Sequence, residues 1–225
     1  MTQIKKDKMC PRISSASTFD AVVLCDGDYP SHPVPLSILS RAQYLVCCDG
    51  AGMHHILHGG TPDAIVGDGD SLPGDFKRRY ADILHQVDEQ DDNDQTKATR
   101  FCIDKGFRRI AFVGCTGKRE DHTLCNISLM MRYMKVFGLD VTMITDNGYF
   151  VPASGHQRFE SFARQQVSIF NFGCSHLSGK GFKWQPYPYK EWWQGGLNEA
   201  LGDEVEIDAD GDYLLFFTFD SKNPK

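Results

Sequence analysis

The segment Ala64-Ile65-Val66-Gly67-Asp68-Gly69-Asp70-Ser71 decides the fold class and marks the first candidate site. It begins as a short run of apolar, mostly branched side chains, which is typical of a strand buried on both faces of a sheet. A polar turn with glycines and aspartates comes immediately after it. In an open α/β sheet, ligands bind beyond the carboxyl ends of the strands. The segment therefore predicts a buried parallel strand that ends at a ligand site.

Similar apolar runs alternate with helical patterns over the first two thirds of the chain. We expect further strands at residues 19–25, 44–48, 83–87, 110–114 and 141–145, and helices at residues 36–42, 52–58, 74–80, 94–105 and 121–137. In the last helix, one face carries Leu124, Ile127, Met131 and Met134. This alternation predicts an α/β domain with a doubly wound, mainly parallel sheet.

The pattern changes near Asp146-Asn147-Gly148, where helices give way to short strands and turns. We expect strands at residues 149–151, 157–161, 167–172, 177–184, 204–208 and 213–219. Asp210-Gly211 is a hairpin signal between the last two. The sequence thus predicts a flexible lead-in at residues 1–18, the α/β domain at 19–147 and a smaller all-β sandwich domain at 148–225.

Composition limits the possible functions. The chain has 225 residues and a net charge of −6, which argues against nucleic-acid binding because that usually needs a basic face. Its apolar runs are far shorter than the ~20 residues that cross a membrane, and residues 1–18 lack the apolar core of a secretory signal. The eight cysteines include no C-x-x-C pair. Buried reduced thiols in a cytoplasmic protein are favoured over a disulfide framework or a zinc site.

Acidic residues come directly after several of the expected strands. Asp49 follows the strand at 44–48, and the acidic run at 88–94 follows the strand at 83–87. In extended chain, Asp68 and Asp70 would point the same way and could face one small cation. Oxygen ligands favour Mg²⁺, Mn²⁺ or Ca²⁺ over zinc. Taken alone, the segment at 67–71 could also be a polar turn that caps a helix.

The acidic run leads into a helix. Asn93 or Asp94 could cap that helix, and acidic runs are usually solvated. Lys97 lies three residues after Asp94, so the two can share a helix face. A carboxylate for a metal and an amine for a phosphate would then stand side by side.

Thr116-Gly117-Lys118-Arg119 opens another helix after a strand. Free N–H groups at a helix start bind phosphate, although the spacing is not that of a Walker A loop. Arg119 suits bidentate phosphate contact, with a surface salt bridge as the alternative. Asp121 could simply complement the helix dipole. The pair His54 and His58 has helical spacing but lacks the H-E-x-x-H pattern of a zinc site.

The order of these segments resembles that of the thiamine pyrophosphokinases. The resemblance rests on Asp49-Gly50, on residues 62–71, on Gln90-Asp91-x-x-Asp94-x-x-Lys97-Ala98 and on Thr116-Gly117-x-Arg119-x-Asp121-His122. Gly181-Phe182-Lys183-Trp184 and then Asn198-Glu199 agree in the β-rich part. The joint order of four acidic motifs is far more specific than any one of them.

The resemblance implies an enzyme that moves the terminal diphosphate of ATP to the hydroxyethyl oxygen of thiamine, giving thiamine diphosphate and AMP. Residues 19–147 would bind ATP, and residues 148–225 would bind thiamine in a homodimer. The motif match implies four sets of site residues: Asp68, Asp70 and Asp94 for Mg²⁺; Asp49, Gln90, Thr116, Gly117, Arg119 and His122 for ATP; Asp94, Asp121, Lys97 and Arg119 for catalysis; and Trp184 and Asn198 for thiamine.

Three residues depart from the pattern of this family. Asn93 stands where Thr is common, Lys118 where Gly is common, and Leu197 where Ser is typical. Leu197 removes a hydroxyl near the expected thiamine site. Two alternatives therefore stay open: a Mg²⁺-dependent kinase or pyrophosphokinase for a different hydroxyl-bearing heterocycle, and a nucleotide or thiamine sensor without turnover.

Overall fold

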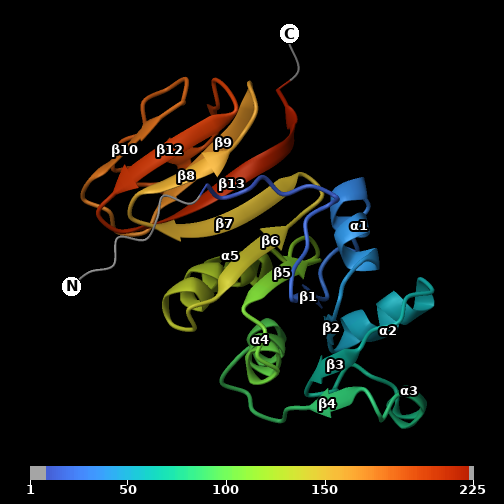
Figure 1. Ribbon diagram of the computed structural model, residues 1–225. Helices are drawn as coiled ribbons and strands as arrows, with labels where there is room; N and C mark the ends of the chain where they lie inside the picture. Colours follow the sequence, from blue (N-terminus) through green and yellow to red (C-terminus); the bar gives the residue numbers. More distant parts are fainter. Residues whose placement is uncertain (1–8, 223–225) are drawn as a thin grey trace. The chain divides into compact units, whose positions relative to one another are not determined.

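The protein is described from a computed structural model, which covers residues 9–222 (Figure 1). The chain divides into two compact units. One unit is formed by residues 15–146, and the other combines residues 147–222 with residues 9–14.

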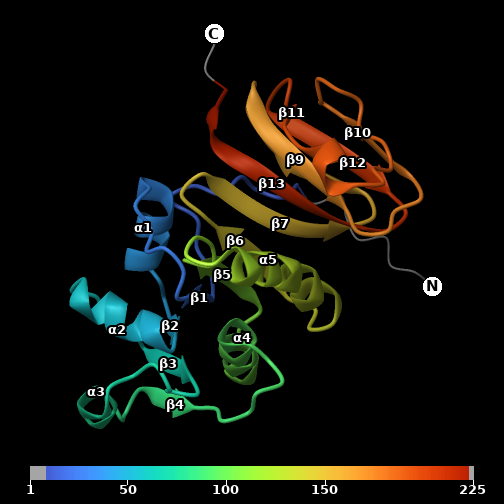
Figure 2. The same ribbon diagram turned by 180° about the vertical axis from the view of Figure 1, so that it is seen from behind.

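The first unit contains the expected parallel sheet. Its strands are β1 (Ala21–Leu24), β2 (Leu45–Cys48), β3 (Ala64–Gly67), β4 (Leu84–Gln86), β5 (Arg109–Val113) and β6 (Asp140–Ile144). Their order is β6-β5-β1-β2-β3-β4, and every neighbouring pair is parallel (Figure 1, Figure 2). β1, β2 and β3 are buried throughout, as their continuous apolar runs predict. The chain moves outward from β1 to β4 and then returns to β5, so the topological switch lies between β1 and β5.

Five helices connect these strands. They are α1 (Pro33–Ser40), α2 (Gly50–Leu57), α3 (Gly74–Arg79), α4 (Asp94–Asp104) and α5 (Glu120–Lys135). α4 packs on β1, β2 and β3 through buried side chains that include Ala98 and Cys102. Among residues 9–222, no helix combines the length and apolar character that a membrane span requires.

The prediction of which residues form the buried face of α5 is partly wrong. Leu124 is 59% exposed, whereas the buried residues of this helix are Met130, Met131 and Tyr133. The reason is that only the C-terminal half of α5 covers the sheet, at β6, while its first turns extend toward the carboxyl ends of the strands.

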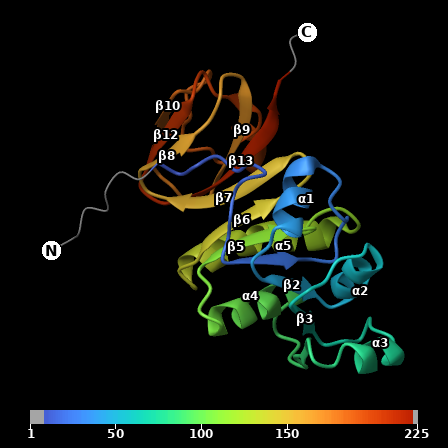
Figure 3. The ribbon, with the colours of Figure 1, turned by 45° about the vertical axis from the view of Figure 1, so that its right-hand side comes forward.

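The second unit contains two antiparallel sheets. The strands are β7 (Gly148–Ser154), β8 (Gln157–Glu160), β9 (Gln165–Asn171), β10 (Leu177–Lys180), β11 (Asn198–Glu199), β12 (Glu204–Ala209) and β13 (Asp212–Ser221). The orders are β11-β9-β13-β7 and β10-β12-β8 (Figure 3). Phe159 of β8 meets Phe217 of β13 with ring centroids 5.7 Å apart, so the two sheets pack face to face as the predicted sandwich.

Two short elements of this unit were not expected, namely the 3₁₀ helix η1 (Trp192–Gly195) and β11. Both are too short to produce a periodic pattern. The strand expected at residues 177–184 ends at Lys180, because Gly181 adopts a left-handed φ of 79° that breaks the extended chain.

The flexible lead-in requires a correction. Residues 1–8 lie outside the described residues, but Cys10 pairs with β8: its N–H donates to Arg158 O at 2.8 Å, and Glu160 N–H donates to its carbonyl at 2.9 Å. Ile13 is buried. Backbone pairing to an open strand edge fixes this segment, and such pairing needs no side-chain pattern that the sequence could reveal.

Candidate active site

The carboxyl ends of the parallel strands surround a cavity of about 580 Å³ in the α/β unit. It is lined by residues that come after β1, β2, β3 and β5 and by the segment that leads into α4. Of the site residues that the resemblance implies, nine line it: Asp49, Asp68, Asp70, Gln90, Asp94, Lys97, Gly117, Arg119 and His122. Thr116 and Asp121 are not part of this lining, and Trp184 and Asn198 belong to the all-β unit.

Asp49 presents a buried carboxylate at the end of β2. Gly67 makes room for it, since a Cβ at Gly67 would lie 2.7 Å from the Asp49 Cβ. The Ser71 hydroxyl and N–H both donate to Asp49 Oδ2, the latter at 3.3 Å. Within residues 9–222, Asp49 Oδ1 is buried and has no hydrogen-bond partner. A buried charged oxygen without a partner is costly, so this atom is suited to contact a cation.

Asp68 and Asp70 are brought together by a turn rather than by an extended strand. The N–H of Asp70 donates to Asp68 Oδ1 at 3.0 Å, and Gly69 supplies the left-handed φ of 77° that the turn needs. The expectation that the two side chains point the same way by strand alternation is therefore wrong. Hydrogen bonds from the Asp70 N–H and then from the Gln90 amide lower the pKa of Asp68, so its carboxylate is charged at neutral pH.

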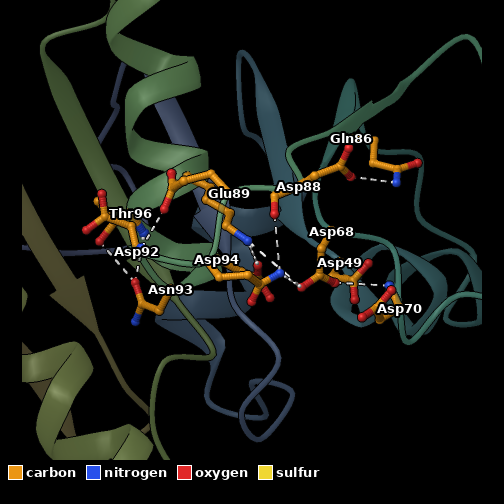
Figure 4. A network of polar contacts seen from close by, with 12 residues as sticks. Asp49, Asp68, Asp70, Gln86, Asp88, Glu89, Asp92, Asn93, Asp94 and Thr96 are labelled. Atoms are coloured by element: carbon orange, nitrogen blue, oxygen red, sulfur yellow. Dashed lines mark hydrogen bonds and ion pairs between the residues drawn. The ribbon is translucent and has the colours of Figure 1, made fainter.

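Figure 4 shows Asp68 and Asp94 in one network of polar contacts. Lys97 is buried beside both of them: its Nζ lies 3.6 Å from Asp94 Oδ1 and 3.9 Å from Asp68 Oδ2. Asn93 caps α4 by accepting the Thr96 N–H at 3.0 Å, which places Asp94 in the first turn, on one helix face with Lys97. Burial raises the pKa of Asp94; Lys97 opposes that rise, and the charges of Asp49 and Asp68 add to it. The three carboxylates thus act on one another electrostatically.

These residues fit a divalent cation that arrives with a nucleotide. Among residues 9–222, no three His, Cys, Asp or Glu side chains form a group that could hold a metal ion by themselves. Mg²⁺ usually takes only one or two carboxylates and completes its shell with water and substrate phosphates, so no such group is required. The oxygen donors, their mutual repulsion and the unpaired Asp49 Oδ1 all suit a hard cation.

Arg119 and Asp121 form a two-point ion pair at the start of α5. Arg119 Nε lies 3.1 Å from Asp121 Oδ1, and Nη2 lies 2.6 Å from Oδ2. The pair lowers the pKa of Asp121 to about 2. Both side chains are exposed, so the salt bridge considered from the sequence is present, while Arg119 also reaches the cavity wall.

Sequence reasoning missed Asp26, which lines the cavity directly after β1. Its Oδ1 lies 3.0 Å from Lys118 Nζ and 3.0 Å from His54 Nδ1. The other residues were found by inspecting the polar positions just beyond each strand, and the same rule points to Asp26. His58 stacks on Tyr29, with ring centroids 4.1 Å apart, and its Nδ1 lies 2.8 Å from His54 O, so the two histidines do not share a ligand as a zinc pair would.

Two family models match this chain. Residues 36–143 match the catalytic domain of thiamin pyrophosphokinase, and residues 148–216 match its substrate-binding domain. The chain belongs to the thiamine pyrophosphokinase family. The catalytic-domain match contains every predicted cavity residue from Asp49 to His122, whereas Asp26 lies before it.

Individual thiamine pyrophosphokinases are similar in sequence and in fold. The chain is 29% identical over 108 residues to thiamin pyrophosphokinase 1 of Caenorhabditis elegans and 28% identical over 151 residues to thiamine pyrophosphokinase 1 of Oryza sativa. These alignments span 44% and 56% of both partners, so the chain spans about half the length of the curated relatives it matches.

Two solved structures show the fold. The thiamin pyrophosphokinase of Candida albicans has 15% sequence identity and a TM-score of 0.74, over 98% of this chain and 95% of that chain. The Bacillus subtilis structure has 20% identity and a TM-score of 0.72, over 89% and 99%.

The match to the substrate-binding domain of thiamine pyrophosphokinases includes Trp184 and Asn198. Asn198 is buried, and its side-chain amide is hydrogen-bonded to the backbone of Trp184. Nδ2 donates to Trp184 O at 2.7 Å, and Oδ1 accepts the Trp184 N–H at 3.2 Å. The indole of Trp184 is 52% exposed. Asn198 therefore holds the Trp184 backbone in place, while the half-exposed ring carries the Lys183 ammonium 4.7 Å from its centroid. Leu197 beside it is exposed and adopts a left-handed φ of 63°.

Proposed function

We propose that this protein transfers the terminal diphosphate of ATP to the hydroxyethyl oxygen of thiamine, giving thiamine diphosphate and AMP. The observation that carries the proposal is the convergence of Asp49, Asp68 and Asp94 in one cavity, with buried Lys97 beside the last two. Converging carboxylates are costly unless cations compensate them. Phosphoryl-type transfer needs positioning and charge neutralisation more than covalent help, and this cavity offers both.

In this proposal Asp68, Asp70 and Asp94 would hold Mg²⁺, and the ion would supply positive charge to the phosphate oxygens. Asp49, Gln90, Gly117 and His122 line the ATP pocket, with Thr116 in the same loop, while Lys97 and Arg119 contribute positive charge to the phosphates. The thiamine oxygen forms a bond to the β-phosphorus. The bond from that phosphorus to the bridging oxygen of the α-phosphate breaks, and AMP leaves with the electron pair.

The hydroxyl of thiamine must lose its proton, and Asp94 and Asp121 are the two carboxylates among the implied catalytic residues. We infer that Asp94 accepts this proton. Asp94 lines the cavity beside Lys97. Asp121 is not part of the lining, and its charge is already satisfied by the two-point pair with Arg119, which makes it a weak base.

We further propose that the protein is a homodimer in which the all-β unit takes part in thiamine binding. Support comes from six exposed apolar side chains within one short stretch of that unit, residues 184–201, which we call the aromatic patch: Trp184, Tyr187, Trp192, Trp193, Leu197 and Leu201. Exposed apolar side chains that gather on a surface mark interaction sites. A cytoplasmic location is also a proposal, and it is supported by the cysteines, none of which forms a disulfide within residues 9–222.

The test is to incubate the protein with ATP, Mg²⁺ and thiamine and to measure AMP and thiamine diphosphate. Thiamine-dependent release of AMP is expected. Asp70→Asn should lower turnover about 100-fold with the fold intact, since a pre-organised charge contact is worth that much in the transition state. The matched control is Asp104→Asn at the far end of α4, which should behave like the parent protein. Near-normal turnover of Asp70→Asn would remove Asp70 from the ligand set.

The same assay separates the alternatives. The exposed Leu197, with its left-handed backbone, motivates a second acceptor as a candidate, because it lies next to Asn198 and Trp184. AMP release with a related heterocyclic alcohol but not with thiamine would favour that acceptor. Nucleotide binding without AMP release would favour a sensor.

A further inference from the structure

Three cysteine thiols meet at the floor of the cavity. Cys25 comes directly after β1, Cys48 ends β2 and Cys115 lies two residues after β5, and all three line the cavity while being almost fully buried. Cys115 Sγ lies 3.3 Å from Cys25 Sγ, and Cys48 Sγ lies 3.9 Å from it. The proposed diphosphate transfer uses none of these thiols.

The sheet topology brings Cys25 and Cys115 together. β1 and β5 are hydrogen-bonded parallel neighbours, with Leu24 opposite Val113. The N–H of Cys25 continues this ladder by donating to Val113 O at 2.8 Å. Continued by one residue, this register sets Cys25 opposite Gly114, and Cys115 is the next residue along the chain. The two sulfurs already lie 3.3 Å apart, so a bond of about 2.05 Å needs only a small movement beyond the strand ends.

We propose that Cys25 and Cys115 are an oxidative modification site, at which a peroxide converts the two thiols into a disulfide. One sulfur attacks the O–O bond of the peroxide and becomes a sulfenic acid, and the peroxide is reduced to an alcohol or, for hydrogen peroxide, to water. The second sulfur then attacks the sulfenic sulfur and displaces water. In total the thiols lose two protons and two electrons, which the peroxide takes up.

Cys115 is the expected partner of Cys25 because it is closer than Cys48. The reaction is slow relative to that of an exposed thiol. The hydrogen bond from Cys115, together with burial, raises the pKa of the Cys25 thiol, and the thiolate is the reactive form. Cys125 of α5 is exposed and provides an internal reference for ordinary thiol oxidation.

Disulfide formation would alter the cavity. The sulfurs would move from 3.3 Å apart to about 2.05 Å. This movement pulls on two loops that line the cavity, Asp26-Gly27 after β1 and the segment around Gly117 and Lys118 after β5. A misplacement of about 1 Å can lower a rate about 100-fold. This consequence for turnover rests on the proposed function, whereas the disulfide itself does not.

The first experiment maps the bond without using activity. The full chain is treated with hydrogen peroxide, denatured in N-ethylmaleimide, digested and analysed by mass spectrometry. A peptide pair linked through Cys25 and Cys115 is expected, and dithiothreitol should separate it. Cys115→Ser should abolish any link to Cys25, whereas the matched variant Cys125→Ser should leave it intact. The proposal is overturned if both thiols remain alkylated while Cys125 is oxidised, or if Cys25 links mainly to Cys48.

The second experiment measures thiamine-dependent AMP release before and after oxidation. A loss of about 100-fold that dithiothreitol reverses is expected, and the oxidised Cys115→Ser should retain the turnover of its own untreated sample. An oxidised protein that carries the mapped disulfide with unchanged turnover would overturn the effect on the cavity. If the protein shows no thiamine-dependent turnover, the proposed function is wrong. The mass spectrometry of the first experiment would still decide whether the disulfide forms.

Discussion

At the scale of single residues, two lysine ammonium groups line the cavity, and each is paired with a carboxylate. Lys97 is buried between Asp68 and Asp94, and Lys118 is held at the opposite wall by Asp26. The first arrangement keeps two carboxylates close together before any substrate arrives. The second places an ammonium group at the start of α5, where the N–H groups of the helix also favour phosphate.

Removing the buried ammonium should affect both stability and turnover. Lys97→Met leaves Asp68 and Asp94 without their cation, so we expect a loss of about 3 kcal/mol in the free energy of unfolding. Turnover should fall about 100-fold. Mg²⁺ should raise the melting temperature of the variant more than that of the parent protein. Lys105→Met at the end of α4 is the control. Equal responses to Mg²⁺ in the variant and the parent would contradict this account.

Lys118 offers a prediction that separates charge from backbone strain. Its left-handed φ of 50° is unfavourable for any residue with a Cβ, by about 1 kcal/mol, and glycine relieves it. Both Lys118→Gly and Lys118→Ala lose the ammonium, so both should raise the KM for ATP severalfold. In addition, Lys118→Gly should be more thermally stable than Lys118→Ala. Steady-state kinetics and thermal denaturation of the pair provide the measurement. An unchanged KM in both variants would exclude Lys118 from phosphate binding.

At the scale of elements, strand ends were the most predictable feature of the site. All six strands of the α/β unit were expected within two residues of their observed ends, because buried parallel strands show as continuous apolar runs. The turn at Asp68-Gly69-Asp70 was located but given the wrong geometry, since a left-handed glycine cannot be distinguished by pattern from an extended one. Contacts made by the backbone alone, such as the pairing of Cys10 with β8, could not be predicted, because they require no particular pattern of side chains in the sequence.

The junction between β1 and β5 gives a prediction for acid conditions. Asp20 accepts the N–H groups of Arg109 and Arg108 at 2.8 and 2.9 Å, and these bonds lower the pKa of Asp20. A lowered folded pKa stabilises the protein above the unfolded value of about 3.9, and this contribution is lost as the pH falls through the folded pKa.

Asp20→Asn should therefore destabilise the protein by about 1 kcal/mol at neutral pH, a value discounted for the exposure of this side chain. The difference from the parent should shrink toward about pH 3. Urea denaturation at the two pH values is the measurement, with Asp104→Asn as the control. A difference that stays constant with pH would show that the charge of Asp20 is not responsible.

At the scale of the whole molecule, the change from alternating strands and helices to short strands near Asp146 indicated two kinds of architecture, and both are present. The sequence could not reveal which apolar side chains stay exposed, because exposure depends on tertiary packing. Trp193, for example, is 75% exposed in the aromatic patch. In the proposed homodimer, a second copy of the chain would cover these side chains.

The homodimer is therefore the last prediction, and it can be tested separately from ATP binding. Stable dimers bury more than about 1,000 Å² in total, so a charge placed within the patch should separate the subunits. Trp193→Asp should convert a dimer to a monomer in size-exclusion chromatography with light scattering. It should also raise the KM for thiamine while leaving the affinity for ATP unchanged, because the cavity lies entirely in the α/β unit. Leu57→Asp, at an equally exposed position of α2, should leave the dimer intact. A parent protein that is monomeric at all concentrations would contradict the proposal, and a change in ATP affinity alone would mean that Trp193 acts on the cavity rather than on an interface.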